Sequence, residues 1–188
     1  VFPLLLAAGV SLVSIALLWP RRKTEGVPAL MLMLMAAALW SLLDTMIFGL
    51  DDLGVRILLA NIEYLFITSA PVLWFIFVAQ YTSRGDKVAG WRKVWLFIIP
   101  AITVALVWTD QYHGLVRHDF WLDTRGSFYV TRKTYGPWFW AFTAYANALL
   151  LWSAVKLALA LYRSPDLYRS QVIVLLVGMA SPWIGNYV

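Results

Sequence analysis

Carboxylate and amide side chains occur inside stretches of this sequence that are otherwise almost wholly apolar. The segment "NIEYLFITSAP" carries Asn61 and Glu63 within a run, 56–81, that has the composition of one long apolar helix. Polar groups in an apolar environment are costly unless they are paired, so each one needs a structural or functional reason. We take these residues as candidates for binding a ligand or acting as a switch: Asp44, Asn61, Glu63, Tyr64, His113, Tyr145, Asn147 and Asn186.

The spacing within this run indicates which of its polar groups face the same way. Arg56 and Glu63 are seven residues apart, which is nearly two turns of an α-helix, so they share one face. Asn61 and Tyr64 lie on a different face. A helix that is polar on two sides is expected at the centre of a bundle, because neither side suits an apolar surrounding.

We expect Asp44, Glu63 and Asn186 to meet in one cluster near an end of this bundle. Such a cluster has two interpretations. It forms the floor of a ligand pocket or a proton-sensitive switch, or it consists of hydrogen bonds that only hold helices together, a common use of polar groups between membrane helices.

The remaining residue types give little basis for catalysis or metal binding. His113 and His118, with Asp110 and Asp119, form a weak metal-site pattern, and we interpret both histidines as loop residues that add pH sensitivity. The chain has no cysteine, so it has neither disulfide nor thiolate chemistry. We find no nucleophilic triad, glycine-rich phosphate loop or HExxH motif, and we predict no catalytic residues, no metal and no cofactor.

The composition places these residues in a membrane. Hydrophobic residues make up 62% of the chain and charged residues 13%, whereas about a quarter of residues are charged in soluble proteins. The mean hydropathy is +0.73. Apolar runs long enough to cross a hydrocarbon core of about 30 Å recur along the chain. We predict an all-α membrane protein, a bundle with helices at 2–19, 28–48, 56–81, 93–109, 137–163 and 171–188.

Basic residues set the expected orientation of this bundle in the cell membrane. Lysine and arginine are concentrated in the first, third and fifth connections, which predicts that these are cytoplasmic and that the N-terminus is outside. The sixth helix then ends outside. We therefore expect a seventh helix after Val188, so that the sequence is truncated before it.

The long connection before residue 137 has a pattern of its own. "HDFWL" and "SFYVT" are aromatic and β-branched runs on either side of the turn-prone "DTRG", which predicts a β-hairpin that covers the outer mouth of the bundle. Pro71, Pro100 and Pro182 each interrupt a predicted helix, and each is expected to kink it.

Four separated segments together resemble a known family. They are "NIEYLFITSAPVLWFIFVAQYT", "WTDQYHGL", "YGPWFWAFTAYANALLL" and "YRSQVIVLLVGMASPWIGN". In this order and spacing they resemble the N-terminal seven-transmembrane sensor region of bacterial and archaeal histidine kinases, a region also attached to diguanylate cyclases. The matching positions are Glu63, Tyr64, Pro71, Pro100, Thr109, His113, Gly136, Pro137, Tyr145, Arg169, Gln171, Pro182 and Asn186.

The resemblance implies a receptor in a two-component signalling system. An outer-side stimulus, an unidentified small molecule or a condition of the surrounding membrane lipid, would change helix packing, and the last helix would pass that change to a cytoplasmic kinase or cyclase domain. It also implies a homodimer joined through that output domain, and no nucleic-acid partner. The alternative is a fragment of a secondary transporter or channel with Glu63 and Asp44 on the translocation path, although we find no internal repeat of the kind many transporters show.

Overall fold

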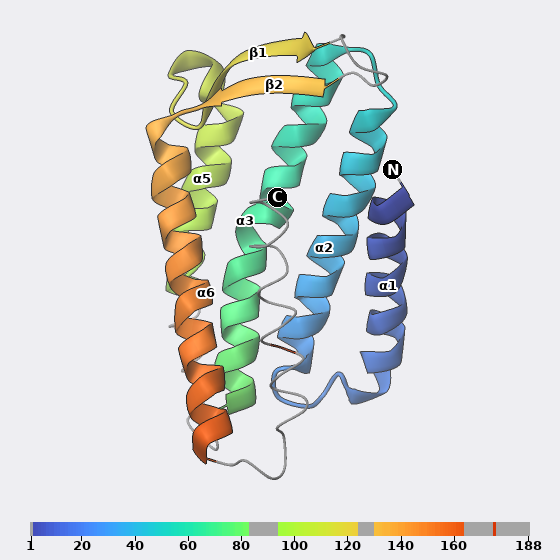
Figure 1. The fold of residues 1–188 in the computed structure, drawn as a ribbon, viewed down its shortest axis with the longest axis vertical. Coiled ribbons are helices and arrows are strands. Elements are labelled where there is room, and N and C mark those ends of the chain that lie inside the picture. Colours follow the sequence, from blue (N-terminus) through green and yellow to red (C-terminus); the bar gives the residue numbers. More distant parts are fainter. Residues whose placement is uncertain (1, 83–93, 124–129, 164–174, 176–188) are drawn as a thin grey trace.

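The protein is a bundle of upright helices with a small sheet lying across one end (Figure 1). This structure is a computed structural model that describes residues 2–82, 94–123, 130–163 and residue 175. The first helix starts at the end that carries the sheet, and the chain then runs alternately down and up the bundle. The sheet therefore lies at the same end as the N-terminus.

Within the described residues, four helices are long and apolar enough to cross a membrane. They are α1 (Phe2–Leu18), which the 3-10 turn η1 (Trp19–Arg21) extends, α2 (Val27–Phe48), α3 (Leu53–Thr82) and α6 (Pro137–Arg163). They confirm the predicted all-α membrane bundle and agree with the predicted ranges to within a few residues. The predicted span 171–188, with Pro182 and Asn186, lies outside the described residues.

The span predicted at 93–109 is shorter in the structure. Helix α5 covers only Ile98–Trp108, because a turn at Leu96 and Phe97 interrupts the apolar run. Pro100 is the third residue of α5, and Leu96, four positions before it, lies in this turn, so the predicted helix is interrupted where the proline ring would clash with a preceding carbonyl. Pro71, in contrast, lies in the interior of α3 and is buried. Hydropathy could not locate the turn, since both of its residues are apolar.

Helix α3 is the centre of the bundle, as its two polar faces predict. Of the 18 consecutive residues that form the most apolar stretch of α3, 56% are buried. The corresponding stretches of the other three long helices are between 11% and 17% buried. Helices α2, α5 and α6 pack against it, and α1 packs on α2. The core combines Val72, Phe77 and Val78 of α3 with Leu149 and Leu157 of α6.

The predicted hairpin is present. Strand β1 (Arg117–Asp123) pairs antiparallel with β2 (Val130–Tyr135). A bulge in β1 lies between His118 and Trp121. Asp119, inside the bulge, has a φ of 54°. The second strand includes Val130 and Thr131 of the predicted run "SFYVT", continues to Tyr135, and leads directly into α6. The turn was expected at "DTRG", residues 123–126, of which 124–126 lie outside the described part of the chain.

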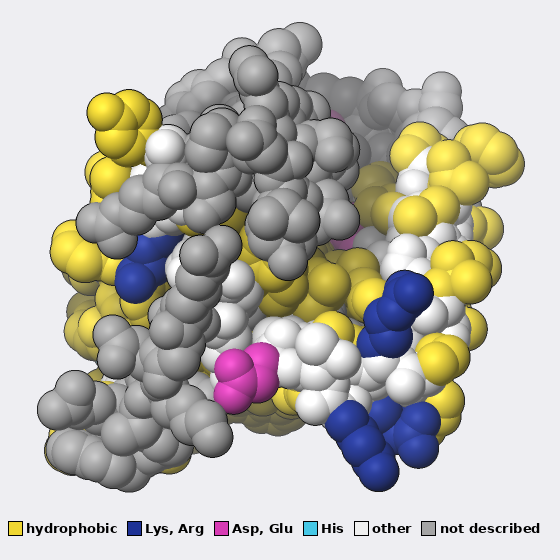
Figure 2. Space-filling view, turned by 90° about the horizontal axis from the view of Figure 1, so that it is seen from below, with side chains coloured by type: hydrophobic (Ala, Val, Ile, Leu, Met, Phe, Trp, Pro, Cys, Tyr) yellow, Lys and Arg dark blue, Asp and Glu magenta, His cyan; other side chains and the backbone are white. Residues whose placement is uncertain are grey.

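The opposite end of the bundle carries exposed basic side chains. Figure 2 shows Lys and Arg side chains gathered along one edge of that end. Arg21, Arg22 and Lys23, which follow α1, are all exposed. Thus the hairpin and the first basic connection occupy opposite ends of the helices.

Candidate functional site

Arg117, the first residue of β1, is buried where the hairpin meets α3. It is 2% exposed. Its Nη2 donates a hydrogen bond to Asn61 Oδ1, and its guanidinium carbon lies 4.5 Å from the centre of the Tyr64 ring and 5.4 Å from that of Phe120. Among the described residues, its Nε and Nη1 have no hydrogen-bond partner. Burial lowers the pKa of Arg117, while Tyr64 and Asp110 oppose that shift.

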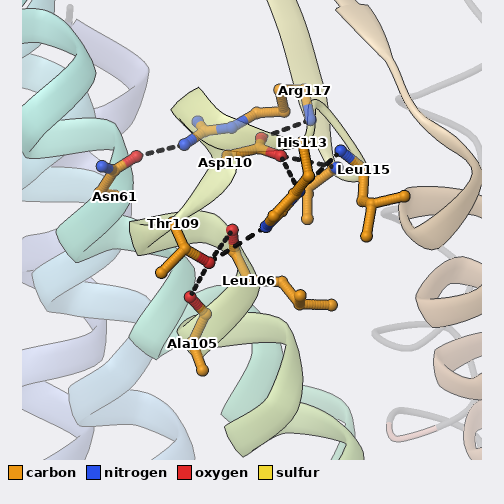
Figure 3. A network of polar contacts seen from close by, with 9 residues as sticks. Asn61, Ala105, Leu106, Thr109, Asp110, His113, Leu115 and Arg117 are labelled. Atoms are coloured by element: carbon orange, nitrogen blue, oxygen red, sulfur yellow. Dashed lines mark hydrogen bonds and ion pairs between the residues drawn. The ribbon is translucent and has the colours of Figure 1, made fainter.

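Asp110 holds the start of β1 in place (Figure 3). It belongs to the 3-10 turn η2 (Asp110–Tyr112), which follows α5, and its carboxylate is buried. Its Oδ1 accepts the Val116 N–H at 3.0 Å, and its Oδ2 accepts the Arg117 N–H at 2.6 Å. Hydrogen bonds to an ionised acceptor are about twice as strong as neutral ones. Asp110 therefore fixes the backbone from which the Arg117 side chain reaches α3.

His113 completes the same turn. Its Nδ1 accepts the Leu115 N–H at 3.1 Å, and its Nε2 lies 3.1 Å from Thr109 Oγ1 (Figure 3). Since Thr109 Oγ1 donates to the Ala105 carbonyl at 3.0 Å, we assign the Nε2 proton to the bond with Thr109. The segment "WTDQYHGL" thus builds a turn, and the His113 ring uses both nitrogens within it.

A small cavity of about 180 Å³ brings together charged residues from α2, α3 and both strands. Two acids, Asp44 and Glu63, line it, so the structure brings together the two predicted cluster members that lie within the described residues. Glu63 is 7% exposed, and its Oε1 is buried with no hydrogen-bond partner among the described residues. Three bases also line the cavity: Arg56, Arg117 and Lys133.

Arg56 and Lys133, which line the small cavity together with Arg117, differ in what they contact. Arg56 donates to the Leu50 carbonyl at 2.6 Å and to Thr131 Oγ1 at 3.0 Å, and so joins the start of α3 to β2. Lys133 is partly buried on β2. Burial and the neighbouring Arg117 lower the pKa of Lys133, and the charges of Glu63 and Asp44 oppose them.

A larger cavity of about 490 Å³ adjoins the small one. The two share Ile57, Arg117 and Phe120 as lining residues. Asn61 and His113, both predicted from the sequence, line the larger cavity, as does His118. The buried Arg117 therefore stands between two chambers, one rich in charge and one lined by polar and aromatic side chains.

Two residues proposed from the sequence lie away from both cavities. Tyr145, on α6, donates its hydroxyl hydrogen to the Leu96 carbonyl at 2.6 Å, which ties α6 to the turn before α5. Asn147 is exposed, and its amide donates to the Thr143 carbonyl of its own helix at 2.9 Å. Both hydrogen bonds are structural contacts of helices, which is one of the two interpretations that the sequence left open. Asn186, the third predicted member of the cluster, lies outside the described residues.

The two histidines both line the larger cavity, and each lies beside an aspartate. His113 Nδ1 is 3.4 Å from Asp110, and His118 Nδ1 is 2.6 Å from Asp119. In the part of the chain that the structure describes, no three His, Cys, Asp or Glu side chains converge as metal ligands would. Sequence reasoning placed neither Arg117 nor Lys133 at the site, because no local pattern shows that the hairpin folds back onto α3.

Comparison with known proteins identifies one family. Residues 3–188 match the family described as the N-terminal 7TM region of histidine kinase. No curated protein and no solved structure gives a significant match. The matched range includes the hairpin, α3 and both cavities. The chain therefore belongs to the family of N-terminal seven-transmembrane regions of histidine kinases, and it is a membrane-embedded sensor region.

Proposed function

We propose that a stimulus acts in the two cavities beneath the hairpin, and that the bundle passes its effect to a cytoplasmic histidine kinase domain joined as a homodimer. One observation carries this proposal. Buried charged groups beneath the hairpin retain donor and acceptor atoms that no described residue fills, namely those of Arg117 and Glu63. Buried polar atoms are nearly always paired, and exceptions call for an explanation such as a bound molecule.

The chain connectivity supports a short path from this site to the opposite end. The same hairpin that supplies Arg117 and Lys133 continues through Gly136 into α6, which runs the length of the bundle (Figure 1). Helix α6 packs along α3, the helix that carries Asn61, Glu63 and Tyr64. A ligand that binds two arrangements of the hairpin with different affinity would shift the packing of α6.

Replacing Glu63 with glutamine in the complete protein should change its autophosphorylation several-fold, since coupling between sites is commonly worth about 5- to 150-fold. The substitution keeps the size of the side chain and removes its charge from the small cavity. Autophosphorylation is measured in membrane vesicles, and insertion is checked by the amount of protein in the membrane.

Glu25→Gln is the matched control for this substitution. Glu25 is exposed in the connection between α1 and α2, at the end away from the hairpin, so its variant should behave as the wild type. Unchanged output of Glu63→Gln across stimuli and pH, with normal insertion, would show that Glu63 has only a structural role.

We also propose that the hairpin end faces outside and the basic end faces the cytoplasm. The exposed Arg21, Arg22 and Lys23 support this orientation by the positive-inside rule. The chain has no cysteine, so single cysteines report without a background from this region. A membrane-impermeant maleimide added to intact cells should label Trp121→Cys, 51% exposed in the native protein, and leave Arg22→Cys unlabelled until the cells are opened. Labelling of Arg22→Cys alone would reverse the orientation.

A further inference from the structure

The small cavity is lined by Arg117 and Glu63, whose buried donor and acceptor atoms include some with no hydrogen-bond partner among the described residues. We propose that it binds a small zwitterion, with the ligand's carboxylate on Arg117 and its ammonium group on Glu63. The proposal rests on the proposed function, because it names the chemical class of the stimulus that acts at this site.

The anionic half of the ligand follows from Arg117. One guanidinium nitrogen, Nη2, is already bonded to Asn61, while Nε and Nη1 have no acceptor among the described residues. Tyr64 and Phe120, whose ring centres lie 4.5 Å and 5.4 Å from the guanidinium carbon, restrict how the group can turn. Arginine cannot lose its proton under ordinary conditions, so only an acceptor can satisfy these N–H groups. A carboxylate oxygen is a charged acceptor of the kind that arginine binds best.

The cationic half follows from Glu63. Its Oε1 is a buried acceptor without a donor in the described part of the chain, and a second acid, Asp44, lines the same cavity. An ammonium group supplies three N–H donors in a compact volume. A donor placed here would pair with Glu63 and be attracted by Asp44 as well.

Charge balance favours a molecule with both groups over one with either alone. Among the described residues, the lining has three bases and two acids, a formal charge of +1. A simple carboxylate would leave Glu63 Oε1 without a donor, and a simple amine would add a fourth cation and leave Arg117 Nε and Nη1 without an acceptor. A zwitterion fills both positions and adds no net charge.

The size of the cavity limits the ligand further. Its volume is about 180 Å³, below the roughly 300–1,000 Å³ of pockets that hold drug-sized molecules. The ligand is therefore a small amino acid or a compound with the same two terminal groups.

Calorimetric titration of the complete protein in lipid nanodiscs tests this proposal. The probes are glycine, 3-aminopropionate and 4-aminobutyrate, which carry the same two groups at increasing separation, together with butyrate and butylamine, which each lack one. We expect at least one amino acid to bind and both single-charge probes to bind tenfold or more weakly, since each leaves a buried group unpaired.

Variants identify the two halves of the site. Glu63→Gln should weaken binding of the preferred amino acid tenfold or more, and should reduce the difference in affinity between that amino acid and butyrate. Arg117→Gln should abolish binding of the amino acid and of butyrate. Glu25→Gln should bind as the wild type does. If Arg117→Gln fails to fold, Glu63→Gln alone decides, with circular dichroism as the check on folding. The proposal is overturned if no amino acid binds, if butyrate or butylamine binds as tightly, or if Glu63→Gln leaves the affinity unchanged.

Failure here is distinguishable from failure of the proposed function. If Glu63→Gln alters kinase output but no amino acid binds, the cavity signals and takes another class of ligand. If an amino acid binds at Glu63 and output does not change in the variant, the binding proposal stands and the signalling role of the site fails.

Discussion

Replacing Gly136 with alanine is expected to destabilise the protein by at least about 2–3 kcal/mol, the upper part of the range for inserting a carbon into a packed site. Gly136 joins β2 to α6. A Cβ at this position would lie 2.3 Å from the Leu115 carbonyl oxygen and 2.5 Å from that of Gly114. Both neighbours are backbone atoms, so no side-chain rotation can relieve the contact.

The same contact is fixed by two backbone hydrogen bonds. The Gly136 N–H donates to the Val116 carbonyl, and the Trp138 N–H donates to the Leu115 carbonyl, each at 2.9 Å. Because alanine would separate these chain segments, the hairpin should lose its fixed position over α3. Arg117 would then lose its burial, so the variant should be defective in signalling as well as in stability.

Thermal unfolding in detergent, followed by circular dichroism, measures this effect. Gly9→Ala is the matched control, since a Cβ at Gly9 has nothing within 4 Å and alanine is the better helix former by about 1 kcal/mol. We expect Gly136→Ala to unfold well below the wild type and Gly9→Ala to unfold at or slightly above it. Equal melting of the two glycine variants would show that the approach of the hairpin to α6 is not tight.

Local patterns were sufficient to predict the elements of the fold. Apolar runs predicted the four long helices, because a membrane helix needs a continuous apolar stretch and little else. The aromatic and β-branched runs on either side of the turn-prone "DTRG" predicted the hairpin. The spacing of Arg56, Glu63, Asn61 and Tyr64 predicted that α3 has two polar faces, and the structure confirms α3 as the most buried of the long helices.

The contacts that make the site were beyond these patterns. Arg117 and Asn61 are 56 positions apart, and Arg56 and Thr131 are 75 apart. Such pairs depend on how the hairpin is placed over the helices. The hydrogen bonds of Asp110 in the turn and the close backbone approach at Gly136 determine that placement. Gly136 was noted in the sequence only as a position of the family resemblance, and His113 was also noted as a candidate ligand or switch residue in a loop. The structure adds the backbone groups that these residues meet.

Filling the small cavity with a covalent group is expected to change kinase output about fivefold or more, the lower end of typical coupling between sites. Ala60 lines the cavity on the same face of α3 as Glu63. A cysteine at this position, treated with 2-sulfonatoethyl methanethiosulfonate, would carry an anionic group into a cavity whose lining has a formal charge of +1. The product should occupy the place of a bound stimulus and fix one arrangement of the hairpin.

Trp121→Cys is the control for the reagent. Trp121 is exposed on the hairpin at the same end of the bundle and lines neither cavity. Both variants are made in the complete protein with its other cysteines replaced, and the extent of modification is measured by mass spectrometry. Modification of Trp121→Cys should leave autophosphorylation unchanged.

Autophosphorylation of the fully modified Ala60→Cys protein, compared with the same protein before modification, is therefore the most direct measurement of whether this cavity controls the output. A change of about fivefold or more, with none in modified Trp121→Cys, is the result that a signalling cavity predicts. Complete modification at Ala60→Cys with unchanged autophosphorylation would contradict it.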